Sequence, residues 1–336
     1  MRFTKKMFEV SLLLITLASS LNTYCAIPKE EKTITISAAG DVTLGYYYGQ
    51  SNWNRFDTVA KKNGYDYFFK HVSPIFKHDD LTLVNLEGPL TTSGKRTQKE
   101  FVMRGEPIYT EILTLGSIEA VNLANNHTMD YGLEGYNQTK SALDKSEIAY
   151  FGEDIIMYQE INGIRVALIG AKGWDASQST KDKLKKQIDT AHMQADLVIA
   201  MMHWGVELEH YPNNTQKNLA YYMIDQGVDL VLGSHPHVTQ GLEKYKDKTI
   251  VYSMGNFSFG GNRNPANKET FIYQETFRLT DTEITSVESK VIPCRISSKK
   301  DINNYQPIPL QETEGNTVLN NLKTYSKGFP ISYFSK

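Results

Sequence analysis

Residues 228–240 read VDLVLGSHPHVTQ, a short apolar run that ends at a glycine and then presents two histidines one residue apart. The apolar residues 230–232 are typical of a buried strand, and the glycine permits a sharp turn at its end. Along an extended backbone, the imidazoles of His235 and His237 project to the same side, and the proline between them restricts the chain. The stretch therefore predicts a platform for metal ligands at the end of a buried strand.

Four further apolar runs end in side chains of the kinds that bind metals. They lead into Asp41, Glu87, Asn126 with His127, and His203. Transition-metal ions take about four to six ligands, so two histidines supply at most half of a site. Open α/β sheets place their sites beyond the carboxyl ends of the strands, where side chains from several strands meet. These strand ends therefore predict one shared metal site.

The composition is that of an ordinary globular protein with an ample core. Of the 336 residues, 40% are hydrophobic and 22% are charged, and strand-like runs alternate with helical spacing. That alternation predicts an α/β domain over residues 27–296 and a polar extension over 297–336 that packs on it. Within the domain we expect a helix over 67–76 and edge strands over 271–279 and 286–292. The net charge of −2 and the lack of a basic tract argue against a nucleic-acid partner.

The N-terminus has the layout of a secretory signal peptide. Basic residues precede an apolar run over 10–18, which is shorter than a comfortable membrane span. We expect residues 1–26 to be removed, which leaves Cys294 as the only cysteine and excludes an internal disulfide. The mature protein is then extracytoplasmic, either periplasmic or at the cell surface. The alternatives are a retained signal anchor and lipid attachment at Cys25, although Tyr24 stands where lipidation needs a small residue.

Six motifs follow one another in unbroken order between residues 34 and 260, and together they resemble those of the bacterial capsule (poly-γ-glutamate) synthesis protein family of the CapA type. The motifs are GDVTLG at 40–45, NLEGP at 85–89, NLANNH at 122–127 with DYG at 130–132, HWGVE at 203–207, GSHPHV at 233–238 and YSMGNF at 252–257. Any one of them alone is a weak signal, whereas the ordered set is specific.

The resemblance implies a metallophosphoesterase-like fold, which is a four-layer αββα sandwich of two mixed sheets flanked by helices. It also implies two divalent metal ions, manganese, iron or zinc, and an exported role in making, moving or trimming an anionic exopolymer. The implied metal ligands are Asp41, Glu87, Asn126, His203, His235 and His237. Two positions depart from the calcineurin-like phosphoesterase pattern, because Thr43 stands where a ligating histidine is usual and Glu87 where an aspartate is usual. We therefore expect one of the two metal positions to be weak, empty or differently completed.

Charge balance indicates the chemistry of such a site. Two divalent cations carry four positive charges, against which this ligand set offers only the carboxylates of Asp41 and Glu87. The surplus positive charge favours a bridging hydroxide and an anionic substrate, and Glu87 is the natural bridge between the metals. His127, next to the ligand Asn126, is expected to point across the site as general acid for the leaving group.

Two further residues are candidates for the substrate side of the site. Arg104 can hold an anionic oxygen bidentately. Glu207 is expected to support a ligand histidine and, together with Arg104, to help bind substrate. The stretch from His203 to His210 superficially matches a zincin helix, but Trp204-Gly205 breaks the helix and Glu207 has the wrong offset for His-Glu-x-x-His.

Two classes of function remain open. The first is a metal-dependent hydrolase that cleaves a phosphoester or an amide-linked anionic polymer such as poly-γ-glutamate, and the presence of His127 favours it. The second is a non-catalytic component that binds or scaffolds polymer in an exopolysaccharide or polyglutamate assembly and export system, and Thr43 favours it. Membrane-bound polymer synthesis and export proteins are possible partners in either case. Fold analogy alone also leaves a simple phosphatase open.

Overall fold

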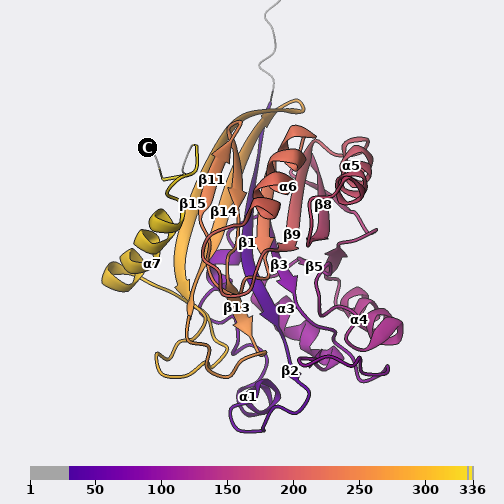
Figure 1. Cartoon of the computed structure of the whole chain (residues 1–336), viewed down its shortest axis with the longest axis vertical. Helices are drawn as coiled ribbons and strands as arrows, with labels where there is room; N and C mark the ends of the chain where they lie inside the picture. The colour runs from indigo at the N-terminus through magenta and orange to yellow at the C-terminus, as the bar shows by residue number, and fades with distance from the viewer. Residues whose placement is uncertain (1–29, 331–332, 335–336) are drawn as a thin grey trace, which may run out of the picture.

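The computed structural model of the chain describes residues 30–330 and 333–334 (Figure 1). The predicted signal peptide over 1–26, including Cys25, lies outside the described residues. Within the described part, no helix combines the length and the apolar character that crossing a membrane requires.

Two mixed β-sheets form the centre of the molecule (Figure 1). The strands of the first sheet are β1 (Glu31–Thr43), β3 (Leu81–Leu86), β5 (Ala120–Asn122), β6 (Ala149–Phe151), β13 (Asn256–Phe259), β14 (Glu269–Thr280), β15 (Glu283–Arg295) and β16 (Ile308–Pro309). Those of the second sheet are β7 (Met157–Ile161), β8 (Ile164–Gly173), β9 (Leu197–Trp204), β10 (Leu230–Ser234), β11 (Leu242–Tyr245) and β12 (Lys248–Val251). A separate two-stranded ribbon pairs β2 (Tyr46–Tyr47) with β4 (Met103–Arg104).

Each sheet has a parallel centre with antiparallel strands added at its sides. The first sheet has the order β16-β15-β14-β1-β3-β5-β6, with β13 beside β1, and the strands from β1 to β6 are parallel. The second has the order β11-β12-β10-β9-β8-β7, with β8, β9, β10 and β12 parallel. The carboxyl ends of the parallel strands therefore meet at one edge of each sheet, which is where α/β proteins place their sites.

Helices cover the outer faces of both sheets. The helices are α1 (Phe56–Asn63), α2 (Ser73–Phe76), η1 (Pro107–Tyr109), α3 (Thr110–Gly116), α4 (Gly132–Lys145), α5 (Gln178–His192), α6 (Asn214–Asp225) and α7 (Glu312–Tyr325). Alternate residues of each strand face opposite sides of its sheet. Leu83 of β3 and Ile199 of β9 face the apolar layer between the two sheets. Their neighbours Val84 and Ala200 face outward, towards clusters that include residues of α1 to α4 and of α5 and α6 respectively. The predicted four-layer αββα sandwich is confirmed.

The C-terminal extension contributes to this core. Val318 and Leu322, one turn apart on α7, join the apolar layer between the sheets, and α7 packs against β15 and β11. Tyr305 is fully buried in the cluster beneath α1 to α4. Figure 1 shows α7 on the left flank of the sheets, across the molecule from α5.

Two local expectations were wrong. The predicted helix over 67–76 is helical only in α2, although its apolar stripe is buried as expected. Pro74 lacks an N–H and so cannot continue a helix from 67, but it suits the first turn of a new one. The strand predicted as an edge over 271–279 is β14, which lies between β1 and β15 and fills the inner layer with residues such as Phe271.

A close approach between two backbones sets the end of β1. The N–H of Asp41 donates to the carbonyl of Gly255 at 2.9 Å. A Cβ at Gly40 would lie 1.8 Å from that carbonyl oxygen, so a side chain at this position is excluded. The contact seats β13 in parallel beside β1, with Asn256 opposite Asp41.

Candidate metal centre

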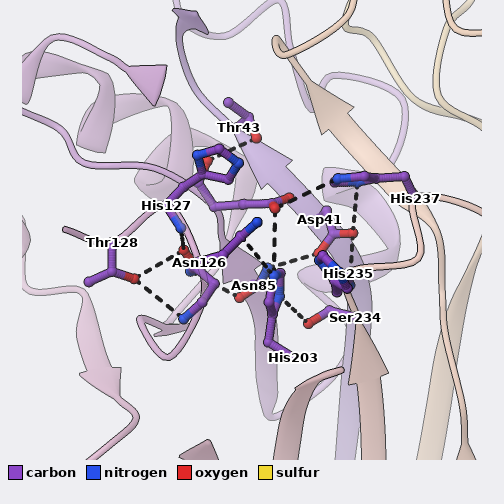
Figure 2. A network of polar contacts seen from close by, with 12 residues as sticks. Asp41, Thr43, Asn85, Asn126, His127, Thr128, His203, Ser234, His235 and His237 are labelled. Atoms are coloured by element: carbon purple, nitrogen blue, oxygen red, sulfur yellow. Dashed lines mark hydrogen bonds and ion pairs between the residues drawn. The ribbon is translucent and has the colours of Figure 1, made fainter. Parts of the chain in front are cut away.

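The six predicted metal ligands converge where strands of the two sheets end (Figure 2). They are Asp41 near the end of β1, Glu87 after β3, Asn126 after β5, His203 in β9, and His235 and His237 after β10. Strand register aligns their neighbours, since Asp41 pairs with Asn85 and His203 pairs with Ser234. The strands thus deliver carboxylate, amide and imidazole groups to one place.

The donor atoms form three overlapping groups. Within each group, one ligand atom from each residue lies within 4.8 Å of the others. The groups are Glu87 with His203 and His235, Asp41 with Glu87 and His237, and Glu207 with His235 and His237. Asn126 joins the first group, because its Oδ1 lies 3.0 Å from His203 Nε2. Glu87, His235 and His237 are each shared by two groups, so the set is one connected cluster.

The centre of this cluster contains buried polar atoms without partners. Both carboxylate oxygens of Glu87 and the Nδ1 atom of His235 are buried and have no hydrogen-bond partner among the described residues. An unpaired buried polar atom costs about 1–3 kcal/mol, so folded proteins rarely retain several together. Carboxylate and imidazole donors are those that manganese, iron and zinc accept. The residues therefore fit a divalent metal centre.

Hydrogen bonds around His203 select the tautomer that ligation requires. The hydroxyl of Ser234 donates to the carbonyl of Met202 at 3.0 Å, so it accepts from Nδ1–H of His203 at 3.1 Å. Asn85 Nδ2, which donates to Asp41 at 2.8 Å, lies 3.2 Å from the same nitrogen but is itself a donor, so Ser234 is the acceptor for the His203 proton. We therefore assign the proton to Nδ1, which leaves a lone pair on Nε2 beside the Asn126 oxygen.

Asn256 orients His237 in the same way. Its Nδ2 donates to the carbonyl of His237 at 3.1 Å, so its Oδ1 accepts from His237 Nδ1 at 2.9 Å. His237 Nε2 then faces Glu87 Oε1 at 3.8 Å. The predicted extended conformation is wrong, because His235 and His237 have φ values of 97° and 57°. The two imidazoles meet the cluster through a turned backbone, a costly conformation that is common at functional sites.

Burial and charge prepare the cluster for a cation. Burial lowers the pKa of His203 well below its ordinary value and lowers that of His235 to about 4, so both rings are neutral at pH 7. Burial raises the pKa of Glu87. It opposes protonation of His237, but the carboxylates of Glu87 and Asp41 raise the pKa of that ring. A cation bound between Glu87 and His237 would displace the proton that they otherwise retain.

His127 lies beside the cluster and is held by an acidic partner. Its Nδ1 is 2.7 Å from Asp130 Oδ2, and Lys99 Nζ is 2.5 Å from the other oxygen of Asp130. The backbone N–H of Met103 also donates to Asp130, at 2.6 Å. Burial lowers the pKa of His127, and Asp130 opposes that effect. The ring is thus fixed through Nδ1, which leaves Nε2 as its proton-transfer atom.

The remaining predicted residues lie at the margin. The hydroxyl of Thr43 donates to the carbonyl of Glu87 at 2.9 Å, so it does not replace a ligating histidine. Arg104 lies outside the donor groups and stacks over Tyr131 at 5.3 Å, one residue from Asp130. It lines a cavity of about 400 Å³, whose other lining residues are Tyr46, Tyr48, Gly49, Gln50, Arg55 and Tyr131. Glu207 is exposed and belongs to the third donor group.

Sequence reasoning missed the residues that orient the ligands. These are Asn85, Asp130, Ser234 and Asn256, together with Trp174, whose ring packs edge-on against His203 and His235. All except Trp174 stand inside the six motifs, beside the residues selected as ligands. The available signal was therefore a second polar residue within each motif.

These features define a class of protein: a four-layer α/β sandwich with a candidate metal centre where strands of its two sheets end. A family model described as bacterial capsule synthesis protein PGA_cap matches residues 35–261. The chain belongs to this family, as the motifs predicted.

Comparisons with two individual relatives agree with the family match. The chain is 32% identical over 288 residues to "Capsule biosynthesis protein CapA" of Bacillus anthracis, covering 77% of this chain and 67% of that protein. It is also 32% identical over 251 residues to "PGA biosynthesis protein CapA" of Bacillus subtilis (strain 168), covering 68% and 64%. Among solved structures, 5'-nucleotidase from Candida albicans SC5314 has a TM-score of 0.44 and 13% identity, covering 88% of this chain and 57% of that one. The match thus spans about two thirds of the length of the two Bacillus relatives.

Proposed function

We propose that this protein is a metal-dependent hydrolase of capsule biogenesis that acts on an anionic exopolymer, such as poly-γ-glutamate, or on a phosphoester. The observation that carries the proposal is the buried Glu87 carboxylate, which accepts no hydrogen bond from the described residues and is shared by two donor groups. Two divalent cations, when bound, supply Lewis-acid polarisation of the scissile group and positive charge for an anionic substrate. Glu87, which two donor groups share, would be among the residues that hold them.

His127 acts in this proposal as the proton donor to the leaving group. Asp130 accepts the Nδ1 proton at 2.7 Å, which stabilises the imidazolium form and leaves Nε2–H to be donated. Burial lowers the pKa of the ring, and an anionic substrate in the site would act with Asp130 against that effect, because negative charge favours the protonated form. A residue held in this way has no evident use in a scaffold that only binds polymer.

Arg104 supplies an anchor for the rest of the substrate. Its charge has no carboxylate within ion-pair distance among the described residues, unlike Arg55, which is bonded to Asp57 at 2.6 Å. Tyr131, which also lines the cavity of both arginines, follows Asp130, the residue that holds His127. A polymer with repeated carboxylates, or an organophosphate, would place one anionic group here while a neighbouring bond is cleaved.

The location of the protein is part of the same proposal. The relatives bear names that refer to capsule or PGA biosynthesis. We propose that residues 1–26 direct export and that the mature chain works outside the cytoplasm beside membrane-bound synthesis and export proteins. N-terminal sequencing of protein recovered from cell-surface fractions is expected to begin at Ile27. A start at a lipid-modified Cys25, or an intact Met1, would establish an anchored form instead.

The first test is metal content, measured by elemental analysis on protein that begins at residue 27. We expect about two equivalents of manganese, iron or zinc in the wild type. The double variant His235→Ala, His237→Ala is expected to lose them, whereas the exposed-histidine control His71→Ala, His78→Ala keeps them. Phosphoesters and poly-γ-glutamate are then assayed in parallel. Absence of metal from the wild type after reconstitution would overturn the hydrolase proposal.

One observation favours the second function, a non-catalytic polymer-binding component. Thr43 directs its hydroxyl to the Glu87 carbonyl, so the group formed by Asp41, Glu87 and His237 lacks a ligand that the calcineurin-like pattern supplies. In that case the wild type binds poly-γ-glutamate but neither retains metal nor shortens the polymer. Size-exclusion analysis of polymer incubated with the protein separates the two functions.

A further inference from the structure

Glu207 lies on an exposed loop between β9 and α6, at the solvent side of the cluster. Its carboxylate forms a donor group with His235 and His237, in which the ligand atoms lie within 4.8 Å of one another. His235 is 7% exposed, and its Nδ1 has no partner among the described residues. A carboxylate and two imidazoles are a usual donor set for zinc, manganese or iron.

The loop that carries Glu207 is fixed to the ligand histidines. The N–H of Leu208 donates to the carbonyl of Pro236, which lies between the two histidines, at 2.8 Å. Two residues further on, His210 Nδ1 lies 2.9 Å from the carbonyl of Thr239. The His210 ring stacks on Tyr325 at the end of α7, with a centroid distance of 4.4 Å. The position of Glu207 is thus set by the fold, as a ligand requires.

The rest of the centre is short of one ligand and of negative charge. Thr43 does not face the group of Asp41, Glu87 and His237, which therefore has three donor residues. Two divalent cations carry four positive charges against the two carboxylates of that group. A third carboxylate reduces the excess and adds an oxygen donor next to His237.

We propose that Glu207 is itself a metal ligand, which joins the centre through His235 and His237 and offsets the missing histidine at Thr43. This inference rests on the proposed metal centre. It changes the role expected from the sequence, because Glu207 then contacts the cation directly and does not only orient a histidine or bind substrate. It also ties the metal site to α7, through the His210 contact with Tyr325.

The test compares Glu207→Gln with Glu209→Gln, a matched change two residues along the same exposed loop. Protein from residue 27 onward is stripped of metal and titrated with Mn²⁺ and with Zn²⁺ against a competing chelator, without substrate. We expect Glu207→Gln to weaken binding of one equivalent by at least about 10–100-fold, and Glu209→Gln to bind as the wild type does. Glu207→His, which restores a ligand, is expected to recover most of the affinity.

Each outcome of this titration either supports or overturns the assignment of Glu207 as a metal ligand. Because Glu207 is exposed, thermal unfolding of the stripped variants is expected to match that of the wild type, so a loss of affinity is not a loss of folding. Unchanged metal affinity in Glu207→Gln, with or without a raised KM, would overturn this inference while the metal centre stands. A wild type that binds neither metal would overturn the proposed function and this inference together.

Discussion

The two ends of strand β3 both carry acidic side chains, but only one end satisfies them. At the amino end, Glu119 accepts the N–H of Thr82 at 2.8 Å, and Asp79 accepts the hydroxyl of the same residue at 2.8 Å. At the carboxyl end, both oxygens of Glu87 are buried without a hydrogen-bond partner among the described residues. The amino-end acids therefore belong to the fold, whereas Glu87 fits a cation that the fold itself does not supply.

A raised pKa alone does not distinguish these two ends. Burial raises the pKa of Asp79 to about 6 and that of Glu119 to about 7, and it raises the pKa of Glu87 as well. What differs is the hydrogen bonding: backbone and hydroxyl groups donate to the acids at one end, whereas at the other the imidazoles of His203 and His237 lie 3.7 and 3.8 Å from Glu87, beyond hydrogen-bond distance. A buried polar atom without a hydrogen bond therefore indicates the site better than a raised pKa does.

The largest expected effect comes from Glu87→Leu. This variant is expected to lose its metal and all hydrolytic activity, because it removes the residue that two donor groups share. The metal-free protein is expected to gain about 1–3 kcal/mol in free energy of unfolding, since an apolar side chain of similar size replaces a buried carboxyl that accepts no hydrogen bond from the described residues and whose ion-pair neighbours, His203 and His237, lie at 3.7 and 3.8 Å. Elemental analysis and urea unfolding in chelator test both expectations. A destabilised variant would mean that the contacts of Glu87 with His203 and His237 already compensate for its burial.

The next effect is on catalysis without metal loss. His127→Gln removes the proposed proton donor at the same end of β3, so kcat is expected to fall by about 10²–10⁴-fold while metal content stays at the wild-type value. His71→Gln, on an exposed histidine, is the control and is expected to change neither quantity. Loss of metal from His127→Gln would show that this ring is a ligand and that Asp130 orients it for coordination.

The sequence was sufficient to select candidate ligands that the fold brings together, because their positions follow from local patterns. An apolar run specifies a buried strand, and a polar residue at its end must lie at the sheet edge. Asp41, Glu87, Asn126, His203 and His235 all obey this rule, and parallel pairing then brings them together.

The contacts that orient the ligands depend on packing between distant segments, so local patterns do not determine them. Asn256 reaches His237 only because β13 pairs with the end of β1, across a backbone contact that requires Gly40. A long-range contact likewise fixes the loop that carries Glu207 against the turned backbone at His235: the N–H of Leu208 donates to the carbonyl of Pro236. Such contacts join segments that lie far apart in the sequence, and no periodic residue pattern predicts them.

At the amino end of β3, a similar substitution is expected to act in the opposite direction. Glu119→Leu leaves the buried N–H of Thr82 without its acceptor, so the free energy of unfolding is expected to fall by about 1–3 kcal/mol while metal content is unchanged. Glu119→Gln keeps an acceptor oxygen and is the matched control, with a smaller loss. Equal losses in the two variants would show that the charge, not the hydrogen bond, matters at this position.

The smallest expected effect is a change in the pH dependence of stability. In the folded protein the pKa of Asp79 rises from 3.8 to about 6, and that of Glu119 from 4.5 to about 7, chiefly because of burial. At pH values between the ordinary and the raised pKa of each acid, the folded state therefore binds more protons than the unfolded state. The stability these acids contribute is full below about pH 4 and is lost as the pH rises through 6 to 7.

The double variant Asp79→Asn, Glu119→Gln has no acid that titrates at these two positions, so its stability relative to that of the wild type should increase as the pH rises from about 4 to 8. Urea unfolding of both metal-free proteins at each pH measures the difference, and Glu87 and the histidines contribute equally to both and cancel. Curves that stay parallel would mean that the two acids titrate normally in the folded protein. In that case, desolvation at the amino end of β3 would be much weaker than at Glu87, and the two ends would differ in burial as well as in partners.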